Sequence, residues 1–175
     1  MTQLFSANVD VYYGQAYLEL AGPFDGFMEN CFHGQQNGIC GAAAPQALFL
    51  ITGLHTGPVG MEIHCFDDDP GIDDSWDEIV EVSFLAPRTE IVLVEWAAPR
   101  QALPLTSGAY RARYYARDMD AGRELDTNTT SSAVDTYRID LWRAGRAADR
   151  IIKRTSECAA YWHDWAAGLT DRGRA

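Results

Sequence analysis

The chain has 175 residues, of which 47% are hydrophobic and 22% charged, and its formal net charge at neutral pH is −11. This length provides one domain with a substantial core, and no apolar run approaches the roughly 18 residues that a membrane helix needs. The strong acidity argues against nucleic acid or an anionic membrane as a direct partner.

The N-terminal residues, MTQLFSANVDVYYG, contain no basic segment and no cleavage site after an apolar core. We therefore expect no secretory signal and a cytoplasmic protein. Apolar and polar residues alternate from Asn8 to Tyr13, and a second strand-like run, Ala16 to Leu20, follows Gly14-Gln15. This pattern predicts a β-hairpin with a short turn.

Residues Ala21 to Pro45 are rich in Gly, Pro, Asn and small side chains, with phenylalanines spread among them. We expect a long ordered loop with a helical turn at Asp25 to Cys31, and loops of this kind commonly carry function. Cys31, His33 and Cys40 could supply three zinc ligands, but their spacing matches no known zinc finger. The four cysteines lack CxxC spacing, so we predict reduced thiols, no bound metal and no cofactor.

Four strand-length apolar runs follow, separated by clusters of Gly, Pro or Asp: Leu48 to Leu54, Val59 to Phe66, Ile79 to Leu85 and Ile91 to Trp96. Their composition predicts four consecutive antiparallel strands with one wet and one buried face. His55 and His64 fall on adjacent predicted strands and could face each other as an acid–base pair. No catalytic motif accompanies them, and structural histidines are more common, so we predict no catalytic residue.

Charge is divided unevenly around this centre. Residues 1–87 contain 13 acidic residues and no Lys or Arg, whereas the rest contains 12 acidic residues and all 14 basic ones. The two parts therefore carry formal charges of −13 and +2, which add to −11. Such an imbalance favours a cationic partner, or it serves solubility alone.

An acidic segment with eight carboxylates in fifteen residues runs from Asp67 to Glu81. It lacks the glycine and glutamate spacing of an EF-hand, although a calcium site and a solvated loop both remain open. A third interpretation is that carboxylates on a rigid turn imitate a phosphate array and engage the Lys and Arg side chains of a nuclease. The predicted partner-binding residues are Asp67, Asp68, Asp69, Asp73, Asp74, Trp76 and Asp77. If this segment only solubilises the chain, the functional surface moves to the loop at Ala21 to Pro45.

The run Gly108 to Arg117 predicts a strand on which Arg111 and Arg113 share a solvated face and pair with carboxylates of a neighbouring strand. Met119 to Ser132 is polar and turn-rich, which indicates a mobile loop. Strict alternation then resumes from Val134 to Trp142 and predicts another strand.

The C-terminal part predicts one helix. Thr155-Ser156-Glu157 forms a cap, apolar residues recur at helical spacing after it, and Gly168 ends the run. Thr170 to Ala175 is expected to be a frayed tail. Altogether the sequence predicts a single domain over residues 1–175, mainly β, built as an antiparallel β-sandwich of about eight strands with one C-terminal α-helix.

Several segments resemble uncharacterised actinobacterial proteins of this length. The similar pieces include Val11-Tyr12-Tyr13-Gly14-Gln15, Tyr110-Arg111-Ala112-Arg113 and the C-terminal motif Ala159-Ala160-Tyr161-Trp162-His163. This resemblance covers most of the chain but implies no activity.

The chain also resembles the competence protein ComJ family, whose members inhibit a DNA-entry nuclease. The likeness rests on Gln35 or Gln36 ahead of Ala47 to Leu50, on the strand ending at Phe84, and on Leu103-Pro104-Leu105 leading to Gly108 and Tyr110. It implies a non-catalytic inhibitor or immunity protein that neutralises a basic partner such as a nuclease or toxin. A β-sandwich that binds calcium or a small ligand, and a hydrolase with an unrecognised site containing histidine, are the alternatives.

Overall fold

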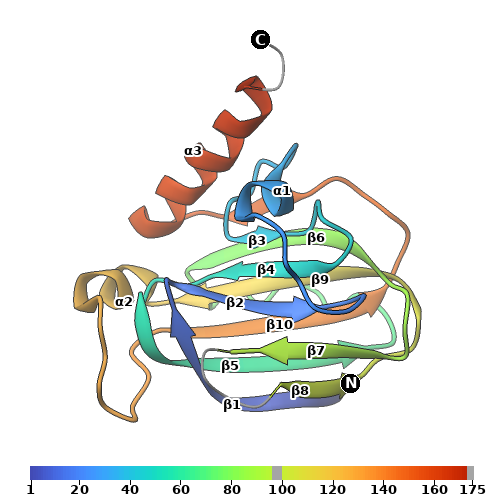
Figure 1. Ribbon diagram of the computed structural model, residues 1–175, viewed down its shortest axis with the longest axis horizontal. Helices are drawn as coiled ribbons and strands as arrows, with labels where there is room; N and C mark the ends of the chain where they lie inside the picture. The colour runs from blue at the N-terminus through green and yellow to red at the C-terminus, as the bar shows by residue number, and fades with distance from the viewer. Residues whose placement is uncertain (96–99, 173–175) are drawn as a thin grey trace.

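The computed structural model describes residues 1–95 and 100–172. Its strands are β1 (Thr2–Tyr12), β2 (Gln15–Glu19), β3 (Cys40–Gly41), β4 (Ala47–Ile51), β5 (Thr56–Phe66), β6 (Glu78–Ala86), β7 (Glu90–Val94), β8 (Gln101–Pro104), β9 (Gly108–Arg117), β10 (Thr136–Arg143) and β11 (Arg150–Lys153). Its helices are α1 (Met28–Phe32), α2 (Met119–Leu125) and α3 (Glu157–Arg172) (Figure 1).

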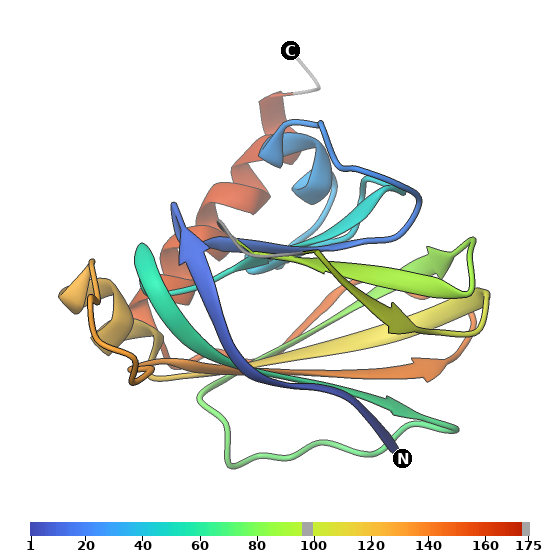
Figure 2. The ribbon, with the colours of Figure 1, turned by 60° about the horizontal axis from the view of Figure 1, so that its bottom comes forward.

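All of these strands belong to one curled sheet. Its main order is β11-β6-β9-β10-β5-β1-β2-β4-β3, and β7 pairs with both β2 and β8. Strands β5 and β10 run parallel, whereas the other pairs are antiparallel. Figure 2 shows the sheet curling into a half-barrel, so that β2 and β7 lie over β5 and β10. The core fills the space between them, and the Tyr114 hydroxyl of β9 donates to the Ile51 carbonyl of β4 across it (3.1 Å).

The predicted mainly β chain with a C-terminal helix is confirmed. The predicted antiparallel sandwich of about eight strands is wrong, because the described strands form one curled mixed sheet. Each of the four central apolar runs does form a strand, as β4, β5, β6 and β7, but none of them pairs with the next along the chain. Strand β5 lies between β1 and β10, and β6 lies between β9 and β11. An alternating apolar strand fits many neighbours equally well, so its sequence does not specify which one it takes.

The predicted N-terminal hairpin is confirmed. Strand β1 pairs antiparallel with β2 at Tyr12 and Gln15. Tyr13 and Gly14 form the turn, and both have left-handed backbone angles (φ 59° and 63°). Two successive left-handed residues are what a type I′ hairpin turn requires, because its twist matches that of the flanking strands.

The helices differ in part from their predictions. Helix α1 forms where a helical turn was expected, but α2 occupies the predicted mobile loop. The Ser156 hydroxyl accepts a hydrogen bond from the Ala159 amide (3.1 Å), which confirms the predicted cap of α3. This helix continues past Gly168 to Arg172, so the predicted stop is wrong; residues 173–175 of the expected frayed tail, like Trp96, lie outside the described residues.

Helix α3 packs against α1 at one end of the sheet (Figure 1). The rings of Phe32 and Trp165 meet edge-on with centroids 5.6 Å apart. The buried His163 accepts a hydrogen bond at Nδ1 from the Gly38 amide (2.9 Å). Within the described part of the chain, no helix combines the length and the apolar character needed to span a membrane.

Candidate binding surfaces

The acidic segment is a strap across the outer face of the sheet. We call residues Asp67–Asp77 the acidic strap; they connect β5 to β6. Because β10 and β9 lie between these two strands, the connection has to cross both of them. Figure 2 shows it passing along the side of the sheet opposite β2 and β7.

Basic side chains from later in the chain fasten the acidic strap. Arg113 donates to a carboxylate oxygen of Asp69 (3.0 Å) and to the carbonyl of Gly71 (2.6 Å). Lys153 donates to the backbone carbonyl of Asp74 (2.7 Å). Burial acts to raise the pKa of Asp69, but hydrogen bonds from the Gly71 amide and from Arg113 outweigh it, and the pKa is lowered.

Asp73 organises the middle of the strap. Its Oδ1 accepts hydrogen bonds from the amide and hydroxyl of Ser75 (3.2 and 2.7 Å), and its Oδ2 accepts from Trp76 Nε1 (3.2 Å) and from Arg138 (3.0 Å). The Ser75 hydroxyl contributes most to lowering the pKa of Asp73, to about 2, and Arg138 lowers it further. This carboxylate therefore holds the strap in one conformation.

The predicted partner-binding residues fall into two groups. Trp76 is only 8% exposed, and its ring packs beside Tyr115 beneath the guanidinium of Arg117 (4.6 Å). Asp77 accepts a hydrogen bond from the Asp118 amide (3.0 Å), and Asp69 and Asp73 are bound to arginines. These four side chains support the strap, although Asp69 is itself exposed. Asp67, Asp68 and Asp74 project into solvent, and Asp74 also lies within ion-pair distance of Lys153 (3.4 Å) while its side chain stays 86% exposed.

Under the strap lies a buried cluster of charges around Glu81, which is 3% exposed. It accepts hydrogen bonds from Arg111 (2.8 Å), Arg113 (2.9 Å) and Arg150 (2.9 Å). The predicted pairing of Arg111 and Arg113 with a carboxylate of a neighbouring strand is thus confirmed. The predicted solvated face is wrong, because these two arginines are 4% and 1% exposed.

The histidine pair does not form. His55 directly precedes β5 and His64 lies near its far end, so about 30 Å separates them at the rise of an extended strand. His64 instead lies beside the buried carboxylate of Asp140 (Nδ1 to Oδ1, 3.4 Å).

The cysteines and His33 do not converge on a site. Burial raises the pKa of the Cys31 thiol to about 11, and it also raises the pKa of Cys40. Within residues 1–95 and 100–172, no three His, Cys, Asp or Glu side chains are grouped so that they could hold a metal ion.

A second surface, which the motifs do not predict, is a groove at the open seam of the half-barrel. Two adjoining cavities of about 350 and 380 Å³ share Ala42, Ala43, Ser83 and Arg146 in their walls. One wall belongs to the loop Ala21 to Pro45, which the sequence offered as the alternative functional surface. We call this feature the seam groove and define it by Ala42, Ala43, Ser83, Phe84, Tyr110 and Arg146.

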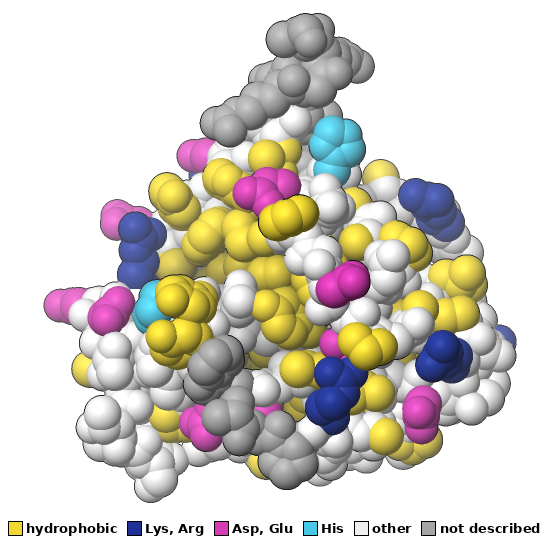
Figure 3. Space-filling model, in the orientation of Figure 1, with side chains coloured by type: hydrophobic (Ala, Val, Ile, Leu, Met, Phe, Trp, Pro, Cys, Tyr) yellow, Lys and Arg dark blue, Asp and Glu magenta, His cyan; other side chains and the backbone are white. Residues whose placement is uncertain are grey.

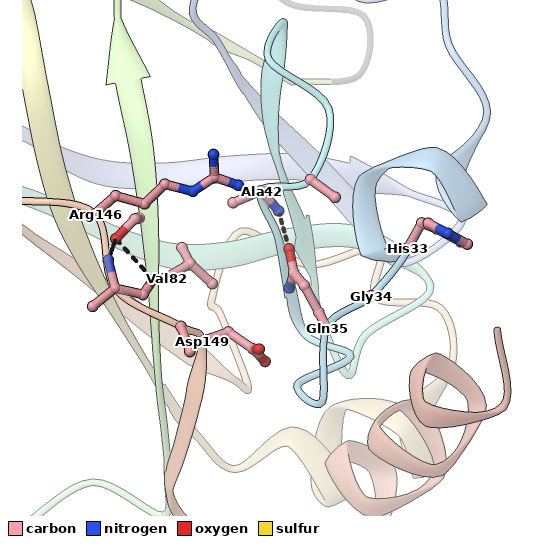
Figure 4. Close-up of a pocket in the computed structure, with 11 residues that line it drawn as sticks. His33, Gly34, Gln35, Ala42, Val82, Arg146 and Asp149 are labelled. Carbon is pink, nitrogen blue, oxygen red and sulfur yellow. Dashed lines mark hydrogen bonds between the residues drawn. The ribbon is translucent and has the colours of Figure 1, made fainter. Parts of the chain in front are cut away.

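The two ends of the seam groove differ in character. Figure 4 shows the polar end, where Arg146 extends across the cavity toward Ala42 and His33 points away from it. At the other end, the rings of Phe84 and Tyr110 stack with centroids 5.5 Å apart beside Leu20 and Pro45. The groove therefore offers an apolar slot next to one cation.

The walls of the seam groove are held by hydrogen bonds. Gln35, which is 8% exposed, accepts from the Ala42 amide (2.6 Å) and donates to the Cys40 carbonyl (2.9 Å). Asp149 accepts from the amides of Gln36 and Asn37 (2.8 Å each), which ties the loop to the segment before β11. On the face drawn in Figure 3, hydrophobic side chains gather toward the centre.

Comparison with known proteins gives a likeness of fold only. No protein-family model matches the chain, and no curated protein matches its sequence. The crystal structure of ComJ from Bacillus subtilis, described as an inhibitor of the DNA-degrading activity of NucA, superimposes with a TM-score of 0.55 at 16% identity, covering 82% of this chain and 98% of ComJ. The crocagin biosynthetic gene J product gives a TM-score of 0.47 at 13% identity over 83% of this chain and 100% of its own. The chain therefore has a ComJ-like fold.

Proposed function

We propose that this chain is a non-catalytic binding protein of the inhibitor or immunity type, which neutralises a cationic protein such as a nuclease or toxin. The ComJ-like fold supports this proposal, since ComJ itself inhibits a nuclease. The formal charge of −11 also supports it, because nucleases bind nucleic acid through Lys and Arg side chains. An acidic surface can occupy those side chains in place of phosphate.

The observation that carries the proposal is the rigid fastening of the acidic strap. Asp69 and Asp73 are tied to Arg113 and Arg138, so the backbone that presents Asp67, Asp68 and Asp74 is already ordered. Ordering a loop during association reduces the net binding free energy, and a preformed array avoids that loss. We therefore assign partner contact to Asp67, Asp68 and Asp74, and support of the strap to Trp76 and Asp77.

Affinity capture followed by an activity assay tests this function. The purified chain is immobilised, proteins from its native host are captured, and each captured protein is assayed for DNA degradation with and without the chain. We expect a basic protein whose DNA-degrading or toxic activity falls in proportion to the amount of chain added. Captured proteins that keep full activity at excess chain would contradict an inhibitor.

Charge variants then test the surface. Neutralising Asp67, Asp68 and Asp74 to Asn should weaken the inhibition at least tenfold, because all three carboxylates would face the partner's cations. The matched control replaces three exposed carboxylates elsewhere, Asp25→Asn, Glu90→Gln and Glu124→Gln, and changes the net charge equally. Equal effects of the two triple variants would remove the strap from the interface and leave only a general effect of net charge.

A further inference from the structure

The sheet has an open edge beside the seam groove. Strand β11 pairs with β6 only from Ile79 to Glu81. From Val82 to Ala86, no strand in the described part of the chain pairs with β6 on the side away from β9. Leu85 in this open stretch is 60% exposed. An unpaired edge with an exposed apolar side chain is a template on which another strand can add.

Arg146 supplies a positive charge beside that edge. Arg146 is exposed, lines both cavities of the groove and reaches across it in Figure 4. Within residues 1–95 and 100–172, Arg146 forms no ion pair. The carboxylate of Asp149, which also lines one of the cavities, accepts hydrogen bonds at Oδ2 from the amides of Gln36 and Asn37. The guanidinium is therefore available to a carboxylate from outside the chain.

We propose that the seam groove binds an extended peptide segment of a partner protein, which adds a strand to the open edge of β6 and directs an acidic side chain to Arg146. Alternate residues of a strand point to the same face, so a residue two positions from the acidic one lies over the slot at Phe84 and Tyr110. The groove thus selects peptides in which an acidic residue and an apolar residue lie two positions apart. Backbone pairing supplies affinity, and these two side chains supply specificity.

The preformed walls of the seam groove favour an extended peptide. Hydrogen bonds of Gln35 and Asp149 hold both sides of the groove before any ligand arrives. The Ser83 hydroxyl is bonded to both the amide and the carbonyl of Ala147 (3.0 and 3.2 Å), so the segment before β11 lies beside Ser83 and the most accessible part of the edge runs from Phe84 to Ala86. This inference does not rest on the inhibitor function, since the acidic strap lies on the outer face of the sheet and the groove lies at the seam.

A displayed library of random twelve-residue peptides, panned on the intact chain, tests the proposal. We expect enriched peptides to alternate apolar and polar residues and to carry Asp or Glu two positions from an apolar residue. A selected peptide labelled with fluorescein then gives a Kd by anisotropy. In NMR spectra of the isotope-labelled chain, binding of the peptide should shift the backbone amide resonances of Val82–Ala86.

Two variants of the groove and one control complete the experiment. Arg146→Gln removes the cation, and Ala43→Trp fills the groove from an exposed position. Each should weaken peptide binding about tenfold or more, as expected for loss of a hydrogen-bonded charge or of the cavity. Arg88→Gln removes an exposed arginine elsewhere and should change the Kd less than twofold. Circular dichroism confirms that each variant is folded.

Four results would overturn the proposal. These are the absence of enriched peptides, enrichment of basic peptides, equal binding by all three variants, and self-association of the chain that occupies the β6 edge in sedimentation. The inhibition assay separates this site from the proposed function. Ala43→Trp should leave inhibition by the strap unchanged, and the triple Asn variant of Asp67, Asp68 and Asp74 should still bind the selected peptide.

Discussion

At the scale of single residues, Glu81 shows how the fold depends on buried charge. It is 3% exposed and forms ion pairs with three arginines, two of which are themselves buried. Burial acts to raise the pKa of Glu81, but the hydrogen bonds and positive charge of Arg111 and its neighbours lower it overall. Removing one member of such a cluster leaves uncompensated charge in the interior, so the cluster fixes the alignment of β6 with β9 and β11.

Asp73 gives a prediction that tests whether its carboxylate stabilises the fold or is merely solvated. The sequence alone suggests that Asp73 and Asp74 are equally solvated, so that neither affects stability. In the structure Asp73 accepts four hydrogen bonds, and Asp73→Asn should lower the free energy of unfolding at pH 7 by about 1 kcal/mol. This value is reduced for solvent screening, because the side chain is 41% exposed. Urea denaturation measures it.

The pH dependence of this stability difference tests whether the ionised carboxylate of Asp73 is its cause. The pKa of Asp73 falls from 3.8 to about 2 in the folded chain, so its contribution is complete above about pH 5 and is lost as the pH falls through 2. The difference between the parent chain and Asp73→Asn should shrink over that range. Asp74→Asn is the control: its side chain is 86% exposed, and its effect should stay within about 0.5 kcal/mol. Equal destabilisation by both variants would contradict the assigned role of Asp73.

At the scale of elements, two glycines near α3 lead to opposite predictions. A Cβ at Gly38 would overlap the carbonyl of Trp162, so Gly38→Ala should push α3 from its place and destabilise the chain by about 1–3 kcal/mol. Gly168 lies within α3 with open space around it, and Gly168→Ala should stabilise the chain by roughly 0.5–1 kcal/mol. Thermal unfolding of both variants measures the signs. A neutral Gly38→Ala would mean that α3 is not docked there.

The sequence predicts where most strands lie because alternation and turn residues are local signals. Apart from the N-terminal hairpin, it does not predict which strands pair, because β5 meets β10 in parallel more than 70 residues along the chain, and nothing local records that choice. The sequence does not predict helix α2, for a related reason. Its Asp120 accepts hydrogen bonds from Ser156 and the Cys158 amide, so contacts with a distant helix stabilise a segment that reads as a loop.

The candidate site was predictable to the same extent. The sequence shows directly that residues 1–87 carry carboxylates and no basic side chain, and that the arginines follow residue 87. Which carboxylates are free is not plain, because that depends on strands β9 and β10 passing beneath the strap. The loop Ala21 to Pro45, which forms one wall of the seam groove, was named from the sequence as the alternative surface. The groove itself was not predictable, since it arises where β11 stops pairing with β6.

At the scale of the whole molecule, folding joins the two unequal parts of the charge pattern. Among the described residues, six basic side chains that follow residue 87 pair with carboxylates that precede it: Arg100, Arg111, Arg113, Arg138, Arg150 and Lys153. The arginine-rich second part thus neutralises much of the acidic first part internally. The net charge of −11 remains, and it is carried by exposed carboxylates such as Asp67 and Asp68.

That remaining charge leads to a prediction about the rate at which the chain meets its cationic partner. Exposed charges attract over a Debye length of about 8 Å at physiological ionic strength, and added salt shortens this range. The association rate constant with the captured partner should therefore fall on the order of tenfold from low salt to 0.5 M salt, while the dissociation rate constant changes much less. Stopped-flow fluorescence measures both. The Asn variant of Asp67, Asp68 and Asp74 should associate slowly at low salt and show a weaker salt dependence than the parent chain. A partner that associates at the same rate at every salt concentration would show that the acidic strap keeps the chain dispersed and does not guide binding.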